Sequence, residues 1–267
     1  MLLPKKFTRV IAAVSLLALG TGGAIQAQPN QQAEEFGPAP RNDAGRVVLG
    51  GSNPEEKGVW TPVFGIFDPI APLEVVPFKP WSEKLYADRQ LHELEPHARC
   101  KASGGSRQFL TPYGVEFVEI PELQKLYIFD IGGPHTFRVV HMDGRSHPAD
   151  PEPSNYGHSI GWWEGDTLVV DTVGFNEDFW FGRRGLPHTE HLHLVERFTR
   201  YNSGRIDYKI TVDDPATYTA PFTGGFNLRW QEDQELFEYI CQQANYADEL
   251  MVGQESDAVD RSSPIVP

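Results

Sequence analysis

Hydrophobic and polar residues alternate along much of the second half of the chain. In 205–212, Ile206, Tyr208, Ile210 and Val212 alternate with polar side chains. A period of two predicts a strand with one buried face. Turn-forming tripeptides and dipeptides separate such segments, as in 143–144 (DG), 164–166 (EGD) and 202–204 (NSG). The expected strands are 115–120, 123–130, 137–141, 160–163, 168–172, 191–201, 205–212, 226–230 and 236–241.

About nine short strands in sequence order predict a mainly β fold. We expect an antiparallel up-and-down barrel or a strongly curved sheet, because closure removes the unpaired edges that a folded protein must otherwise protect. Small barrels of this kind often enclose a cavity for one ligand. The alternative is a lumen filled by side chains. The bulky candidates for filling it are Phe198, Tyr208, Phe226, Trp230 and Phe237.

The first hundred residues show a different pattern. A single helix is expected over 82–95, with Ser82 as its N-cap and Pro96 ending it. Three apolar residues share one face of this helix: Ala87, Leu91 and Leu94. Before it, 28–60 has the composition of a poorly ordered leader, and 63–79 that of an extended strap interrupted by prolines. The expected organisation is a signal peptide at 1–27, leader, strap and helix at 28–99, a β-barrel domain at 100–250 and a flexible tail at 251–267.

The N-terminal residues 1–27 have the pattern of a secretory signal peptide. Lys5, Lys6 and Arg9 precede an apolar stretch over 10–19, and small residues follow. A stretch of this length is too short to cross a bilayer as a helix. The sequence therefore predicts a periplasmic or secreted protein exported by a Sec-type signal, with no transmembrane segment in the mature chain.

Charge narrows the range of partners. The formal net charge is −14, and removal of 1–27 takes it to −17, because that segment holds three basic residues and no acidic one. Binding of nucleic acid requires clustered Lys and Arg, and binding of anionic lipid requires the same. We therefore expect a small-molecule ligand or substrate and no nucleic acid; the sequence indicates no oligomeric state.

The chain contains two cysteines, Cys100 and Cys241. Export to an oxidising compartment favours a disulfide between them. A catalytic thiol is the alternative, but it needs an activating base nearby, and no Cys-centred motif is visible.

Several ordered motifs resemble a large family of exported bacterial proteins known as hypothetical proteins. They are 143–148 (DGRSHP), 157–161 (GHSIG), 163–172 (WEGDTLVVDT), 188–190 (HTE) with His193, 196–198 (ERF), 213–215 (DDP) and 238–241 (EYIC). Trp162 and Phe222 depart from the pattern, which has Arg and Trp there. The resemblance implies a family and carries no activity with it. The hairpin 163–172 also resembles strands of calycin barrels, which is an analogy of fold alone.

Seven of the nine histidines lie between 135 and 193. The densest stretch is 188–193 (HTEHLH), in which His191 and His193 share one face of a strand. With His188 or Glu190 they would offer three ligands to a divalent metal such as zinc. Without a metal, the same groups supply general acids and bases. Solvated or purely structural histidines are the remaining interpretation.

Further candidates lie at strand ends. His158 follows a proline-rich loop and enters a strand, so it is placed at the mouth of the expected barrel. The segment 157–161 also fits the Gly-x-Ser-x-Gly pattern, but the strand, turn and helix context of a nucleophile elbow is absent. Asp171 is expected to point into the barrel, where Arg197 would pair with it. Trp163, Trp180 and Phe181 are candidate aromatic walls, with core packing as their alternative role.

The sequence thus predicts an exported small-molecule enzyme that uses acid–base chemistry, without an organic cofactor. The expected reaction is hydrolysis, elimination, isomerisation or cyclisation of a partly apolar or aromatic substrate in a β-barrel pocket. A non-catalytic binding protein for a hydrophobic ligand or a divalent metal is the alternative. The candidate catalytic residues are His158, His188, Glu190, His193, Asp171 and Arg197, and the candidate metal ligands are His188, His191 and His193.

Overall fold

A computed structural model gives the structure of the chain. It describes residues 36–51, 53, 55–63, 70–132, 136–180, 182–239 and 241. The expected signal peptide at 1–27 and the expected tail at 251–267 lie outside the described residues.

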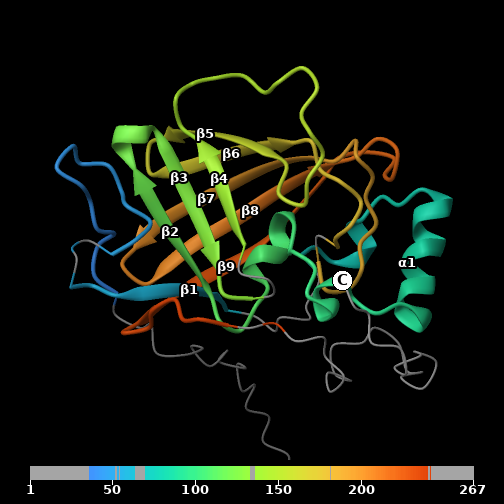
Figure 1. The fold of residues 1–267 in the computed structure, drawn as a ribbon, viewed down its shortest axis with the longest axis horizontal. Helices are drawn as coiled ribbons and strands as arrows, with labels where there is room; N and C mark the ends of the chain where they lie inside the picture. The colour runs from blue at the N-terminus through green and yellow to red at the C-terminus, as the bar shows by residue number, and fades with distance from the viewer. Residues whose placement is uncertain are drawn as a thin grey trace, which may run out of the picture. The chain divides into compact units, whose positions relative to one another are not determined.

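A closed barrel of nine strands forms the body of the described chain (Figure 1). Each strand pairs with the next one along the chain, and the last pairs with the first. The prediction of a mainly β fold with a closed barrel is therefore confirmed. The strands are β1 (Gly58–Pro62), β2 (Val115–Ile120), β3 (Lys125–Asp130), β4 (Phe137–His141), β5 (His158–Glu164), β6 (Thr167–Val173), β7 (His193–Asn202), β8 (Arg205–Asp213) and β9 (Phe222–Glu232).

One pair of strands interrupts the antiparallel pattern. β4 and β5 are parallel, with Val140 paired to Ser159, while the other neighbours are antiparallel. Parallel neighbours need a connection that carries the chain back to the starting end, and residues 142–157 supply it. Figure 1 shows this connection as the long yellow-green loop above β5.

One expected strand, 236–241, is not seen in the described residues, and an unexpected one, β1, completes the barrel. Residues 236–239 and 241 form no strand, whereas β1 lies in the segment interpreted as leader. β1 approaches β9 closely, since a Cβ on Gly58 would lie 2.2 Å from the Trp230 ring. Trp60 and Trp230 then pack with ring centroids 5.0 Å apart. β1 is five residues long and shows little alternation, so pairing with β9 and not local pattern defines it.

Side chains fill the lumen of the barrel. Phe109, from the 3-10 turn η3 (Gly105–Phe109), packs against Phe198 and Tyr208 with ring centroids 5.4 and 5.1 Å apart. All three residues are fully buried. Phe226 contacts Tyr208, but Phe237 is half exposed and takes no part. The rings of Phe109, Phe198 and Tyr208 therefore occupy the lumen at this level, as the filled-lumen alternative expects.

The helix α1 runs over Pro80–His92. Lys79 is its N-cap, and Ser82 lies in the first turn, where its Oγ accepts a hydrogen bond from the Lys79 amide and donates one to the Thr217 carbonyl. The predicted apolar face is not buried, because Leu91 is 55% exposed and Ser82 is the buried residue of the helix. Within the described residues, no helix has the length and apolar character needed to cross a membrane.

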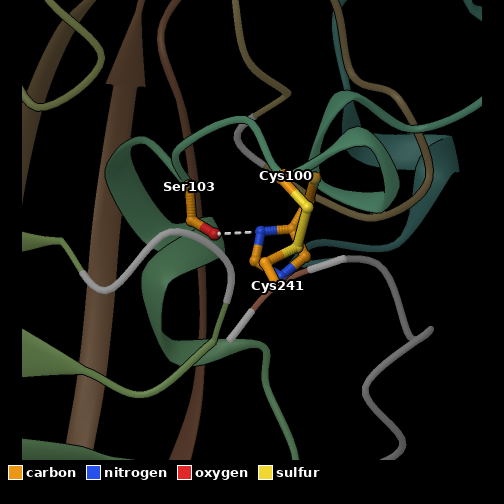
Figure 2. The surroundings of a disulfide bond; sticks show 4 residues. Cys100, Ser103 and Cys241 are labelled. Carbon is orange, nitrogen blue, oxygen red and sulfur yellow. Dashed lines mark hydrogen bonds between the residues drawn. A yellow bond between two sulfur atoms is a disulfide. The ribbon is translucent and has the colours of Figure 1, made fainter. Parts of the chain in front are cut away.

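A disulfide joins Cys100 to Cys241, as predicted (Figure 2). Their Cα atoms are 5.7 Å apart, and the two residues are separated by 141 positions. The entropy of closing so long a loop gives roughly 4–5 kcal/mol of stabilisation. Ser103 lies beside the bond and hydrogen-bonds the His97 ring at 2.8 Å. Burial, together with Arg107 and Arg183, lowers the pKa of His97 to about 3, so this ring is neutral.

Candidate functional site

The strands β4 to β7 carry polar side chains on both faces of the barrel wall. Neighbouring residues point to opposite faces, so Ser159 faces the lumen and His158 faces outward. In β6 the same alternation places Thr172 inside and Asp171 outside. The expectation that Asp171 points into the barrel is therefore wrong, because its strand position belongs to the outer face.

The inner polar residues form a hydrogen-bonded network around Arg138. Its guanidinium donates to Ser159 Oγ at 3.0 Å and to Thr172 Oγ1 at 2.7 Å, and it forms an ion pair with Glu196. Tyr208 donates its hydroxyl hydrogen to Glu196 Oε1 at 2.9 Å. The exposed fraction of each of these side chains is 1% or less. Ser159 is thus a buried hydrogen-bonding residue, so the Gly-x-Ser-x-Gly pattern does not mark a nucleophile.

The outer polar residues form a second chain of contacts, centred on Asp171. His193 Nε2 lies 2.8 Å from Asp171 Oδ1, and His147 Nε2 lies 3.0 Å from the same oxygen. His147 Nδ1 in turn lies 2.8 Å from His158 Nδ1. We call these four residues, with His141, the His–Asp cluster.

Four strands and one loop assemble the His–Asp cluster. His141 ends β4 and stacks on His158 at the start of β5, with ring centroids 5.0 Å apart and planes inclined by 21°. His147 comes from the loop 142–157 and meets His158 edge-on, with centroids 5.1 Å apart. Asp171 and His193 come from β6 and β7. The side chains of His147 and Asp171 are 19% and 21% exposed, so solvent and small molecules reach them.

The environment moves the pKa values of the cluster in different directions. Burial opposes ionisation of Asp171, but the hydrogen bonds from His193 and His147 outweigh it, so the pKa of Asp171 lies below its ordinary value. The hydrogen bond to Asp171 raises the pKa of His193. Burial, followed by the neighbouring His141 and His147, lowers the pKa of His158. The cluster thus pairs a more acidic imidazolium at His158 with a more basic imidazole at His193.

Three of the six residues predicted as catalytic come together in this cluster, namely His158, Asp171 and His193. The other three do not join it. His188 is buried and its Nε2 lies 2.8 Å from the Phe179 carbonyl oxygen, so it braces the backbone. Glu190 is exposed. Arg197 pairs with Glu164 at 2.6 Å and not with Asp171 as expected, because Arg197 and Glu164 both lie near the hairpin end of the outer wall.

The expected metal ligands His188, His191 and His193 do not assemble. Both ring nitrogens of His188 lie near backbone carbonyl oxygens, His191 is exposed, and His193 binds Asp171. Among the residues that the structure describes, no group of three or more His, Cys, Asp or Glu side chains has an arrangement that could hold a metal ion.

The candidate aromatic walls also lie elsewhere. Trp163 packs against the core, with the Arg46 guanidinium 4.3 Å from its ring centroid. Trp180 is buried, and Arg89 lies over its ring at 4.9 Å. Phe181 lies outside the described residues.

Sequence reasoning missed His141 and His147 as members of the site. Both belong to the stretch rich in histidine, but neither is near another histidine in the chain. Strand alternation in β4 places His141 on the outer face with Val139, so the sequence pattern could have predicted the face on which His141 lies. The position of His147 depends on the path of the loop 142–157 and on the parallel pairing of β4 with β5, which no local pattern shows.

Two cavities among the described residues are lined by other parts of the chain. One of about 460 Å³ is lined by residues that include Gly58, Glu116, Trp230 and Glu235. Another of about 350 Å³ lies between the segment 42–51 and β2. Neither contains a residue of the His–Asp cluster, and neither brings together an acid and a base with a shared hydrogen-bonding partner. The cluster is therefore the stronger candidate for chemistry, although it lies on an open wall.

Compared with protein-family models, with curated proteins and with solved structures, the chain gives no significant match. The resemblance of its motifs to a family of exported proteins accordingly stays a prediction. The candidate site depends on the geometry alone.

Proposed function

We propose that the protein is an exported enzyme that performs general acid–base chemistry on a small molecule at the His–Asp cluster. The observation that carries this proposal is the sharing of Asp171 Oδ1 by His147 and His193, with His158 bonded to the far side of His147. Export is supported by the signal-like pattern of 1–27 and by the disulfide. Hydrolysis, elimination and isomerisation are the proposed reaction classes, because a general acid and a general base suffice for them.

The tautomers of the cluster follow from the ionised carboxylate. Asp171 accepts hydrogen bonds, so His147 donates its Nε2–H, and in the proposed reaction the neutral His147 ring has its lone pair on Nδ1. His158 must then donate its Nδ1–H to His147, which leaves a lone pair on His158 Nε2. His158 Nε2 is therefore the base of the proposed reaction.

The chain of contacts also stabilises the proton that the base accepts. When His158 Nε2 takes a proton, its Nδ1 proton can pass to His147 Nδ1. The positive charge then lies on the imidazole that donates to Asp171, where the carboxylate stabilises it. Asp171 orients and stabilises without taking the proton itself.

His193 is the acid of the proposed reaction. Its hydrogen bond to Asp171 favours the imidazolium form, whereas His158 favours the neutral form near neutral pH. When the environments of two titratable groups separate their pKa values in this way, one group can donate a proton and the other can accept one at the same pH. The rate should therefore rise as pH passes the lowered pKa of His158 and fall as pH passes the raised pKa of His193.

The test is a substrate panel incubated with wild type, His158→Gln and His92→Gln. The panel contains esters, lactones, β-elimination substrates and enolisable ketones in D2O, and mass spectrometry reads mass loss, water addition or deuterium uptake. We expect turnover by wild type and His92→Gln, and a rate roughly 10²–10⁴-fold lower for His158→Gln. His92 is a matched control because it lies exposed on α1 with Asp88 as its partner. Equal turnover by His158→Gln and wild type contradicts the proposal, and binding without turnover by wild type favours the non-catalytic alternative.

A further inference from the structure

An exposed strip of aromatic side chains lies on the outer face of β3 and β4. Tyr127 and Phe129 have ring centroids 5.8 Å apart, and each lies 6.0 Å from Phe137. Leu126 and Ile128 are buried beside Tyr127 and Phe129, and Arg138 is buried beside Phe137, so the three rings point outward. Phe137 is 52% exposed. We call Tyr127, Phe129 and Phe137 the aromatic strip.

The aromatic strip is continuous with the His–Asp cluster. Tyr127 pairs with Val139 across β3 and β4, and Ser159 pairs with Val140 across β4 and β5. His158 precedes Ser159 and is therefore level with Val139, two strands from Tyr127. Adjacent strands are about 4.8 Å apart, which puts the Tyr127 and His158 backbones about 10 Å apart on one face. A molecule the size of a substituted benzene spans that distance.

A positive charge borders the same surface. Lys125 pairs with His141 across β3 and β4 and points to the outer face, since Leu126 is buried. Arg145 is neutralised by Asp143 at 2.6 Å, whereas no ion pair found within the described part of the chain includes Lys125. An anionic group on a molecule lying along β4 would complement this ammonium group.

We propose that the aromatic strip and Lys125 bind the ring and the anionic group of an aromatic acid, which is the substrate class of the His–Asp cluster. This inference rests on the acid–base function proposed above. The ring packs on Tyr127, Phe129 and Phe137, and the carboxylate or equivalent group lies at Lys125. A proton on a side chain of the ring would then lie toward His158 Nε2.

Binding of sodium benzoate, followed by NMR chemical shifts of the aromatic and histidine side chains, tests the proposal without any turnover. Benzyl alcohol and sodium cyclohexanecarboxylate are the comparison probes, since one lacks the charge and the other the aromatic ring. We expect benzoate to shift the Tyr127, Phe137 and His158 signals. Tyr127→Ser and Phe137→Ser should each raise the Kd about 3- to 10-fold. Tyr201→Ser should leave the Kd unchanged, because Tyr201 is an equally exposed aromatic residue near the end of β7.

The role of Lys125 has its own readout. Lys125→Gln should lower the preference for benzoate over benzyl alcohol about 2- to 5-fold and leave the benzyl alcohol Kd unchanged. Far-UV circular dichroism and thermal unfolding of each variant establish that the barrel is folded.

The outcomes separate the two proposals. If benzoate shifts no signal of the aromatic strip, or binds Phe137→Ser as tightly as wild type, the aromatic-acid inference is wrong, whatever the turnover of the His158→Gln variant. If benzoate binds the strip but no substrate of the panel is turned over, the acid–base function fails and the binding surface stands.

Discussion

The wall formed by β4 to β7 carries polar residues on both of its faces, but their exposure to solvent differs. Inside, Arg138, Ser159, Thr172 and Glu196 are excluded from water and bonded to one another. Outside, the His–Asp cluster uses the same four strands and remains partly exposed. His158 and Ser159 are adjacent in sequence, as are Asp171 and Thr172. In each pair the first residue belongs to the outer cluster and the second to the inner network.

Burial explains the difference. A buried ion pair keeps a fixed charge state, because moving either partner to its unpaired form in the interior costs several kcal/mol. A partly exposed imidazole exchanges its proton with water, and its pKa responds to each neighbour. The inner network therefore contributes structure, and the outer cluster is able to contribute chemistry.

The largest expected effect is on the inner face. Glu196→Ala removes the carboxylate from the buried Arg138 and should destabilise the fold by about 3–5 kcal/mol. Urea unfolding measures it. The double variant Arg138→Met with Glu196→Leu removes both charges and should recover most of the loss. A loss below about 1 kcal/mol for Glu196→Ala would mean that the inner network is not structural.

Asp130 is a second buried carboxyl, and within the described part of the chain it forms no ion pair, in contrast to Glu196. Burial raises the pKa of Asp130 to about 7, against hydrogen bonds such as that from Tyr156. The folded state then keeps a proton that the unfolded state loses above pH 4, so stability falls as pH rises from about 4 to 7. Asp130→Asn should be more stable than wild type at pH 8 by roughly 2–4 kcal/mol and nearly equal to it at pH 4. Parallel pH profiles for the two proteins would contradict this.

On the outer face, Asp171→Asn should affect chemistry and spare the fold. The variant removes the charge that holds His147 and His193, and we expect turnover to fall about 100-fold. The unfolding free energy should change by less than about 1 kcal/mol, since these groups are partly exposed. Thr172→Val, one residue away on the inner face, is the matched control. It should lower the unfolding free energy and leave turnover nearly unchanged. If both variants lose stability equally, the two faces do not have separate roles.

The smallest expected effect concerns stability and His193. Its raised pKa contributes stability that is fully present below the ordinary pKa of about 6.5 and is lost as pH rises through the folded value. The side chain is 39% exposed, so solvent screening keeps this contribution below about 0.5 kcal/mol. His193→Gln should flatten the stability profile between pH 6 and 8 by this amount in thermal unfolding. A steeper fall of stability with pH in the variant would contradict a stabilising contribution from protonated His193.

Local patterns predicted most of the fold. Alternation located β2 and β4 at their observed bounds, and turn residues located the hairpins, because both signals act within a few residues. Two cysteines, together with the expectation of export, predicted the disulfide. β1 was missed because its pairing with β9 joins distant segments, and Leu236 was wrongly placed in a strand.

The site was only partly predictable. Residue type and clustering selected His158, Asp171 and His193, but the sequence does not show which face of a barrel is open. Asp171 was placed inside for that reason. Arg197 lies on the same outer face, but β6 pairs Asp171 with Val195 and Val169 with Arg197, and Arg197 forms its ion pair with Glu164. His188 looked like a ligand in sequence, and burial against Phe179 made it structural. His147 required the path of a long loop.

The central claim is that two histidines of the outer wall have opposite proton affinities, because Asp171 raises the pKa of His193 whereas burial and the neighbouring histidines lower the pKa of His158. Histidine titration followed by NMR, on wild type and Asp171→Asn, tests it directly. The account predicts that His158 titrates below pH 6.5 and His193 above it in wild type, and that Asp171→Asn lowers the pKa of His193 toward that of His158. Titration of both residues near pH 6.5 in wild type, unchanged by Asp171→Asn, would contradict it.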